Sequence, residues 1–256
     1  MNRIKDKVVL ITGGGSGIGA ATARLVCAEG GKAMLVDASG EALEKTSTAI
    51  INELPEAQVA TFVADVAEAA DALRAVERTL ERFGQIDVVV NNASMRNYSA
   101  LAEATPAEWQ AVVGVNLIGV ANYCRAALPV LRERPGANIV NVSSVHAVTG
   151  RKGMGLYDAT KAGILAMTRT LAFEEAAHGV RVNAVSPGST LTEFHIKRGE
   201  AAGKSAQALK SERQTSLLGR WATPQEIAWP IVWLASDEAS FITGATLMVD
   251  GGLSIM

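Results

Sequence analysis

Cysteine, histidine and aromatic residues are scarce in this chain of 256 residues, with two cysteines, three histidines and 5% aromatic residues. Cys27 and Cys124 both fall within helical patterns, so we expect two buried thiols of a reducing compartment rather than a disulfide. His146, His178 and His195 do not have the spacing of metal ligands. We therefore expect no metal site.

Strong charge and long apolar runs are also missing. The net charge is −2, and the 24 Lys and Arg residues form no basic stripe, which argues against a nucleic-acid partner. The N-terminal MNRIKDKVVLIT passes from charged residues into a short apolar segment, without the apolar core of a signal peptide. No apolar run approaches the roughly 20 residues that cross a bilayer. We therefore expect no membrane partner and a cytoplasmic location.

Short apolar segments rich in β-branched residues alternate with helical patterns along the chain. Strands are predicted at 7–12, 32–37, 57–63, 86–91, 138–143, 180–186 and 246–250. Helices are predicted at 17–29, 41–53, 67–83, 106–133, 155–178 and 224–236. Continuously apolar strands are buried on both faces, as in a parallel sheet, and their alternation with helices indicates a doubly wound α/β fold.

The chain is predicted to form one domain over 1–256. It contains no linker-like change of composition, no internal repeat and no low-complexity segment. The stretch 187–223 has no strand pattern, and its charged and small residues predict that it lies outside the sheet. The fold class is therefore α/β, with about seven parallel strands and helices on both faces.

A glycine-rich segment, TGGGSGIGAATARL, follows the first predicted strand. Gly13, Gly17 and Gly19 fall at the turn into a helix, where a pyrophosphate needs close access to backbone amides. An alternative fingerprint uses Gly15, Gly17 and Ala20, but the first spacing uses more of the glycine run. A plain turn remains the other reading, although a preceding strand and a following helix both favour a dinucleotide site.

An acidic residue ends each of the next two strands. Asp37 can accept hydrogen bonds from both ribose hydroxyls and would repel a 2′-phosphate, and neither Ser16 nor Ala38 offers a compensating positive charge. These residues predict NAD as the cofactor. Asp65 could bind an adenine amino group. Capping of the following helix is the alternative role for each aspartate.

The segment GLYDATKAG places Lys161 four residues after Tyr157, about one helical turn, so the two side chains share a face. A free tyrosine has a pKa of about 10. A phenol that acts as a base near neutral pH therefore needs a neighbouring ammonium that favours its ionised form. A helix-surface pair is the alternative. Ser144, at the end of the fifth strand, could hold a substrate oxygen, with Ser143 or a loop-capping hydroxyl as alternatives.

These motifs, in this order, resemble those of the short-chain dehydrogenases/reductases. The resemblance covers nearly the whole chain and is carried by TGGGSGIG (12–19), Asp37, Asp65-Val66, NNAS (91–94), Asn116 in VNLIG, Ser144, Tyr157-x-x-x-Lys161 and SPGST (186–190). It implies a Rossmann-like fold that transfers hydride between NAD and a secondary alcohol or carbonyl. One departure stands out: the family usually has NNAG, so Ser94 changes the pocket beside the nicotinamide.

The resemblance also implies roles for individual residues. Tyr157 would be the acid/base, Lys161 would tune it, Ser144 would orient the substrate oxygen, and Asn116 would support a proton relay unless it is an ordinary polar helix residue. Thr192 could touch the cofactor or cap a helix. The implied cofactor residues are Gly13, Ser16, Gly17, Ile18, Gly19, Asp37, Asp65, Val66, Asn92, Tyr157, Lys161, Thr190 and Thr192.

The loops that follow the strands predict the substrate site, and 189–216 is predicted to form a lid over it. Eight of the 21 residues in 193–213 are charged, which favours a small polar substrate such as a sugar, polyol or hydroxy acid. Charges that merely face solvent are the alternative, as are a steroid or 3-oxoacyl thioester substrate and a non-catalytic nucleotide sensor. The candidate substrate residues are Ser94, Arg96, His146 and Met154.

An oligomer is the last expectation from the sequence. The predicted helices 106–133 and 155–178 carry long apolar faces. In the family that the chain resembles, these helices and the C-terminal strand region contact other subunits, which implies a homotetramer. The alternative is that the apolar faces only cover the sheet.

Overall fold

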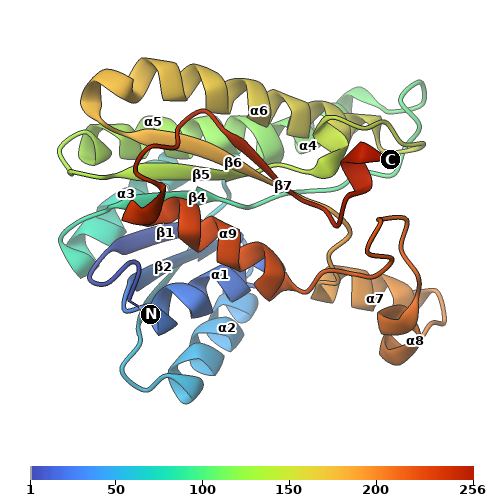
Figure 1. Ribbon diagram of the computed structural model, residues 1–256, viewed down its shortest axis with the longest axis horizontal. Coiled ribbons are helices and arrows are strands. Elements are labelled where there is room, and N and C mark those ends of the chain that lie inside the picture. Colours follow the sequence, from blue (N-terminus) through green and yellow to red (C-terminus); the bar gives the residue numbers. More distant parts are fainter. Residues whose placement is uncertain (1) are drawn as a thin grey trace.

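The sheet of the computed structural model, which describes residues 2–256, contains seven parallel strands in the order β3-β2-β1-β4-β5-β6-β7 (Figure 1). The strands are β1 (Val8–Thr12), β2 (Lys32–Asp37), β3 (Gln58–Val63), β4 (Val88–Asn91), β5 (Asn138–Val142), β6 (Arg181–Pro187) and β7 (Thr246–Val249). The seven-stranded doubly wound sheet is as predicted, with strand ends that differ by at most two residues. The order reverses between β1 and β4, where ligands bind in open α/β sheets.

Burial of the strands differs between the middle and the edges of the sheet. Every residue of β1, β4, β5 and β6 is buried, which explains why their sequences are mostly apolar. Strand β3 contains no buried residue and β7 is half-buried throughout, because both lie at an edge. The prediction that every strand is buried on both faces is therefore wrong for these two.

Helices cover both faces of the sheet (Figure 1). One apolar core lies between the sheet and α1, α2 and α9, and the other lies between the sheet and α3, α5 and α6. The helices are α1 (Gly17–Ala28), α2 (Gly40–Glu53), α3 (Ala69–Phe83), α4 (Pro106–Val113), α5 (Gly119–Leu131), α6 (Gly155–Glu175), α7 (Glu193–Ala201), α8 (Ala206–Ser211) and α9 (Pro224–Ala235).

The structure divides the predicted helix 106–133 into two α-helices, α4 and α5. A π-helical turn, Gly114–Ile118, separates α4 from α5. Contrary to the expectation from the sequence, Pro106–Leu131 is long and apolar enough to cross a membrane, and it is the one such stretch within residues 2–256. Half of its most apolar window is buried inside the protein. A buried core helix passes the same test of length and composition, and α5 packs on α3 and the sheet.

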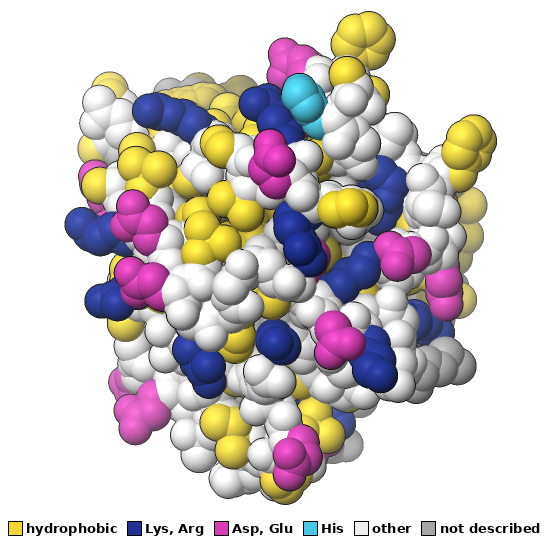
Figure 2. All heavy atoms as spheres, turned by 90° about the vertical axis from the view of Figure 1, so that its left-hand side faces the viewer, with side chains coloured by type: hydrophobic (Ala, Val, Ile, Leu, Met, Phe, Trp, Pro, Cys, Tyr) yellow, Lys and Arg dark blue, Asp and Glu magenta, His cyan; other side chains and the backbone are white. Residues whose placement is uncertain are grey.

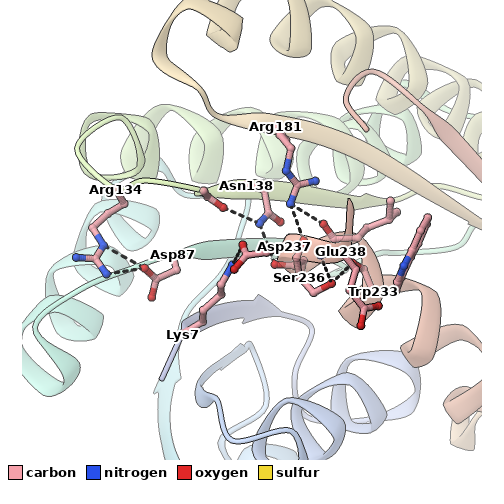
Figure 3. A network of polar contacts seen from close by, with 12 residues as sticks. Lys7, Asp87, Arg134, Asn138, Arg181, Trp233, Ser236, Asp237 and Glu238 are labelled. Carbon is pink, nitrogen blue, oxygen red and sulfur yellow. Dashed lines mark hydrogen bonds and ion pairs between the residues drawn. The ribbon is translucent and has the colours of Figure 1, made fainter. Parts of the chain in front are cut away.

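The amino-terminal ends of the strands are joined by a polar network (Figure 3). The Asp87 carboxylate accepts a 2.7 Å hydrogen bond from the Val8 amide and pairs with Arg134 at 2.8 Å. The side chains of Asn138 and Arg181 donate to backbone carbonyls at the end of α9. These bonds satisfy helix-end carbonyls that would otherwise lack partners. This end of the sheet therefore serves stability.

The surface on the left of Figure 1 carries Lys and Arg side chains interspersed with Asp and Glu, as Figure 2 shows. Oppositely charged side chains also form ion pairs in the structure, such as Lys7 with Asp237 at 2.5 Å and Arg78 with Glu81 at 2.8 Å. Interspersed charges of both signs largely cancel at a distance. No extended field of one sign builds up on this face.

The stretch between β6 and α9 lies outside the sheet, as predicted. It contains the short helices α7 and α8, which project from the carboxyl end of the sheet at the lower right of Figure 1. A single bridge between Thr190 and Ala222 joins the two ends of this stretch. The segment therefore forms one side of the region where the parallel strands end.

Candidate active site

The glycine loop after β1 uses its glycines for two different reasons. Gly13 and Gly17 have φ of +65° and +54°, a backbone conformation that favours glycine. Gly19 is required by packing, because a Cβ there would lie 2.0 Å from the Gly13 carbonyl oxygen. The spacing 13, 17 and 19 therefore has a structural basis, whereas the reading through Gly15 and Ala20 leaves Gly13 and Gly19 unexplained.

The NNAS segment supports this loop from β4. The Asn92 side-chain amide donates 3.0 Å hydrogen bonds to the carbonyls of Thr12 and Gly13. In return, the Thr12 hydroxyl accepts bonds from the backbone amides of Asn92 and Ala93, at 3.0 and 3.1 Å. The ends of β1 and β4 are thus tied together at the point where the strand order reverses.

Asp37 lies beside the loop and contacts it directly. Its two carboxylate oxygens accept 3.0 Å bonds from the backbone amides of Gly15 and Ser39. Ser39, rather than Asp37, is the N-cap of α2, and its hydroxyl accepts a bond from Ala42. Since each carboxylate oxygen has a second lone pair, both can still accept a ribose hydroxyl.

Asp65 holds a turn rather than a helix end. One of its carboxylate oxygens accepts a 2.9 Å bond from the Ala67 amide, while the N-cap position of α3 belongs to Glu68. The capping alternative for Asp65 therefore does not describe this structure. Asp65 and Val66 both line the cavity described next.

A cavity of about 420 Å³ runs along the carboxyl ends of β1, β2, β4, β5 and β6. All predicted cofactor residues except Gly19 line it: Gly13, Ser16, Gly17, Ile18, Asp37, Asp65, Val66, Asn92, Tyr157, Lys161, Thr190 and Thr192. Ser144 lines it as well, and Asn116 does not. Of the predicted substrate residues, Ser94 and Arg96 reach the cavity, whereas His146 and Met154 lie outside its lining.

Tyr157 and Lys161 project from α6 into this cavity. Their exposed fractions are 5% and 1%, so they are not a helix-surface pair. The Lys161 ammonium donates to the Val142 carbonyl at 2.8 Å and lies 5.6 Å from the centre of the Tyr157 ring. Burial, and secondarily the charge of Arg96, lowers the pKa of Lys161 to about 7. Within residues 2–256, the Tyr157 hydroxyl has no hydrogen-bond partner and borders the cavity, so it is free to meet a ligand.

The two serines at the end of β5 have different hydrogen-bond partners. The Ser143 hydroxyl donates its proton to the Lys161 backbone carbonyl at 2.7 Å. The Ser144 hydroxyl instead accepts a 3.2 Å bond from the His146 amide, which leaves its own proton for another acceptor. Both residues border the cavity, but only Ser144 retains a donor for a substrate oxygen.

Asn116 lies within the π-helical turn and is completely buried. Its side chain donates to the Met95 carbonyl and the Thr160 hydroxyl at 2.9 and 3.0 Å, and it accepts from the Met95 amide at 2.7 Å. It therefore joins the loop after β4 to α6, next to Lys161. π-Helical turns occur frequently at functional sites.

Comparison with known proteins identifies the family. Residues 13–254 match the family model described as enoyl-(acyl carrier protein) reductase. The chain is 39% identical to the 3-oxoacyl-[acyl-carrier-protein] reductase FabG of Thermotoga maritima, over 99% of this chain and 100% of the relative. This chain belongs to the short-chain dehydrogenases/reductases.

Other members have a variety of names. L-fucose dehydrogenase of Mus musculus is 37% identical and aligns with 100% of this chain and 91% of its own length. The crystal structure of levodione reductase matches with a TM-score of 0.92 and 36% identity, covering 99% of each chain. As a member of this family, the protein is an oxidoreductase that uses a nicotinamide cofactor.

The residues of this short-chain dehydrogenase/reductase fit such a cofactor. The glycine loop leaves backbone amides accessible at the start of α1, where a pyrophosphate binds favourably. The Gly17 amide already binds an anion, because it donates a 2.9 Å hydrogen bond to the Glu193 carboxylate. Glu193 lies in the first turn of α7, so this carboxylate must leave the amide before a phosphate can take its place.

Residues of the segment between β6 and α9 also reach the cavity. Thr192 occupies the N-cap position of α7 without a capping side-chain bond, and its hydroxyl lies 3.0 Å from His195 Nδ1. Thr190 is buried, and its hydroxyl donates to the Gly188 carbonyl at 3.2 Å. Phe194 and His195 line the cavity, and sequence reasoning did not single them out. Their position within 189–216 was the only signal that could have identified them.

The two cysteines and the possible metal ligands also bear on the predictions from the sequence. Cys27 and Cys124 are both free, as predicted, but only Cys124 is fully buried. Burial raises the pKa of each thiol to about 12, so neither is a reactive thiolate near neutral pH. Within residues 2–256, no group of three or more His, Cys, Asp and Glu side chains is arranged to hold a metal ion.

Proposed function

We propose that this enzyme interconverts a secondary alcohol and a carbonyl with NAD(H), on a small polar substrate. One observation carries the proposal. The Tyr157 hydroxyl, without a hydrogen-bond partner in residues 2–256, shares a cavity with a Ser144 hydroxyl whose proton is uncommitted and with the Lys161 ammonium. This combination can hold and protonate one oxygen atom.

The chemistry follows from the position of each group. Ser144 donates a hydrogen bond to the substrate oxygen, while Tyr157 exchanges a proton with that oxygen. The Lys161 ammonium favours the ionised phenol. Asn116 fixes the Ser94–Met95 turn and α6 relative to each other, which keeps the reacting groups in register. The bound cofactor supplies or accepts the hydride.

NAD is the proposed form of the cofactor. Asp37 lies at the end of β2 beside the glycine loop, where it can accept both ribose hydroxyls and repel a 2′-phosphate. The lining residues next to it, Ser16 and Ala38, carry no positive charge. Together with two free cysteines, this cofactor supports the proposal of a cytoplasmic enzyme.

The polar substrate is supported by the lid, for which we propose residues 189–216. Of the three large apolar side chains in 193–213, Leu209 is buried against Gly199, and only Phe194 lines the cavity. Arg96 and His195 are polar lining residues that lie against it, 5.4 and 5.5 Å from the centre of its ring. A large apolar ligand needs a mostly apolar lining. The names of the relatives span a sugar dehydrogenase and an acyl-carrier-protein reductase, so they do not decide the substrate.

A matched substrate panel tests this proposal. Aldoses, polyols, hydroxy acids, steroids and 3-oxoacyl thioesters are assayed with NAD or NADH by NADH absorbance. We expect a polar substrate to have the highest kcat/KM, because it alone satisfies the polar groups at this end of the cavity. A steroid or thioester that exceeds every polar candidate by more than about tenfold, or 1.4 kcal/mol, contradicts the proposed substrate class.

A homotetramer is the proposed assembly. The outer face of α6 exposes 88% of Phe173, the π-helical turn exposes 48% of Ile118, and the C-terminal segment exposes 80% of Ile255. The inner faces of α5 and α6 pack on the sheet, whereas Phe173, Ile118 and Ile255 are not part of that core. We expect light scattering at micromolar concentration to give the mass of four 26.7-kDa chains. A monomeric mass contradicts this assembly.

A further inference from the structure

We infer that Arg96 binds an anionic group of the substrate beside Tyr157, so that the enzyme acts on a small hydroxy acid and the corresponding oxo acid. This inference rests on the proposed alcohol–carbonyl chemistry and specifies its substrate class. The inference rests on a guanidinium in the cavity that has no acidic partner among residues 2–256.

Arg96 lies on the loop after β4, half-buried in the lining of the cavity that holds Ser144 and Tyr157. The central carbon of its guanidinium is 5.5 Å from the centre of the Tyr157 ring and 5.4 Å from that of Phe194. The group is thus held between the proposed acid/base and the lid. A single small molecule can touch both Tyr157 and Arg96.

The partner of Arg96 is a neutral ring rather than a carboxylate. One guanidinium nitrogen lies 2.7 Å from His195 Nε2, and the other ring nitrogen of His195 meets the Thr192 hydroxyl at 3.0 Å. Burial, followed by the charges of Arg96, Arg198 and Arg151, lowers the pKa of His195 to about 4. At neutral pH the imidazole therefore accepts from Arg96 and orients it without neutralising it.

No acidic side chain within residues 2–256 lies within ion-pair distance of Arg96. Arg151 is a useful contrast, because it is also 5.4 Å from the Tyr157 ring but pairs with Asp158 at 3.1 Å. Half-buried guanidinium groups normally have acidic partners. Arg96 has five donors, and the His195 contact uses one of them.

The charges along the cavity are divided between its two ends. The acidic lining residues, Asp37 and Asp65, follow β2 and β3, at the end proposed for the adenosine. The end near Tyr157 has Arg96 and Lys161. The positive field there extends to His146, whose pKa is lowered to about 4 by burial and then by Arg151 and Arg96. A substrate anion would neutralise this end of the cavity.

Carboxylate, sulfonate and phosphate groups share the chemistry that a guanidinium recognises, since each can accept two parallel hydrogen bonds. The test therefore uses short 2-hydroxy and 3-hydroxy acids, their neutral amides, and the sulfonate and phosphate counterparts. Each compound is assayed with NAD in the wild-type enzyme and in Arg96→Met and Arg96→Lys. Circular dichroism and NADH binding confirm that each variant is folded.

In the wild-type enzyme, we expect an acid to exceed its amide in kcat/KM. In Arg96→Met, kcat/KM for the acid should fall by about 10- to 100-fold, mainly through KM, while that for the amide changes by less than about threefold. Arg96→Lys should give an intermediate loss, because it keeps the charge without the planar fork. Arg78→Met is the matched control: Arg78 is an exposed arginine of α3 that pairs with Glu81 at 2.8 Å, outside the cavity lining.

Calorimetric binding of an unreactive carboxylate of the same length to the enzyme–NADH complex gives a second measurement. Binding that Arg96→Met abolishes and Arg78→Met preserves supports the inference, even for an acid that is not turned over. If a sulfonate or a phosphate binds best, that group is the anion that Arg96 recognises, and the role of Arg96 is unchanged. Equal loss for acid and amide, or carboxylate binding unaffected by Arg96→Met, overturns it. Turnover of neutral alcohols then leaves the proposed function standing, whereas no NAD-dependent turnover of any alcohol contradicts that function.

Discussion

A Tyr157→Phe variant should lose about 10²- to 10⁴-fold in kcat, the usual contribution of a general acid/base. The substitution removes one oxygen from a side chain that is only 5% exposed and leaves the ring to pack as before. The glycine loop and Asp37 contribute the proposed dinucleotide contacts and are untouched. NADH binding, followed by fluorescence, should therefore change little while steady-state turnover collapses.

Tyr98→Phe is the matched control for this loss, because it makes the same chemical change at a half-exposed tyrosine that does not line the cavity. Its kcat should remain close to that of the wild-type enzyme. If Tyr157→Phe retained more than about a tenth of wild-type kcat, the proton would have to pass through another group.

Preference for NAD over NADP is the second large effect expected. A 2′-phosphate beside the Asp37 carboxylate places like charges together, which costs several kcal/mol, and each 1.4 kcal/mol corresponds to a factor of about ten. We therefore expect kcat/KM with NAD to exceed that with NADP by about 100-fold or more. Asp37→Asn should narrow this ratio by roughly tenfold while retaining an oxygen that accepts the Gly15 amide.

Asp65→Asn is the control for the cofactor prediction. It removes the other carboxylate that lines the cavity, at the end of β3. Because we assign Asp65 to the adenine rather than the ribose, its replacement should weaken the binding of NAD and of NADP to a similar extent. Equal kcat/KM values for NAD and NADP in the wild-type enzyme would show that Asp37 does not select the cofactor.

The sequence by itself determined the sheet and most of the cavity. Apolar segments located all seven strands, and parallel strands end at one edge of a sheet, so residues at strand ends come together without any knowledge of loop conformation. Asp37, Asp65 and Ser144 were found in this way, and all three line the cavity. The interval between Tyr157 and Lys161 placed both on one face of α6 because a helix repeats every 3.6 residues.

The choice between neighbouring residues and the contents of the substrate end required the tertiary structure. The sequence favoured Ser144 over Ser143, but the physical reason came from the tertiary structure, in which the Ser143 hydroxyl is bonded to the Lys161 carbonyl, 18 positions away. The contact between Arg96 and His195 spans 99 positions, and that between Gly17 and Glu193 spans 176. Such contacts join loops that have no periodic pattern, and their partners depend on how the region between β6 and α9 folds across the sheet. Local sequence carries no information on that geometry, because it results from packing among distant segments.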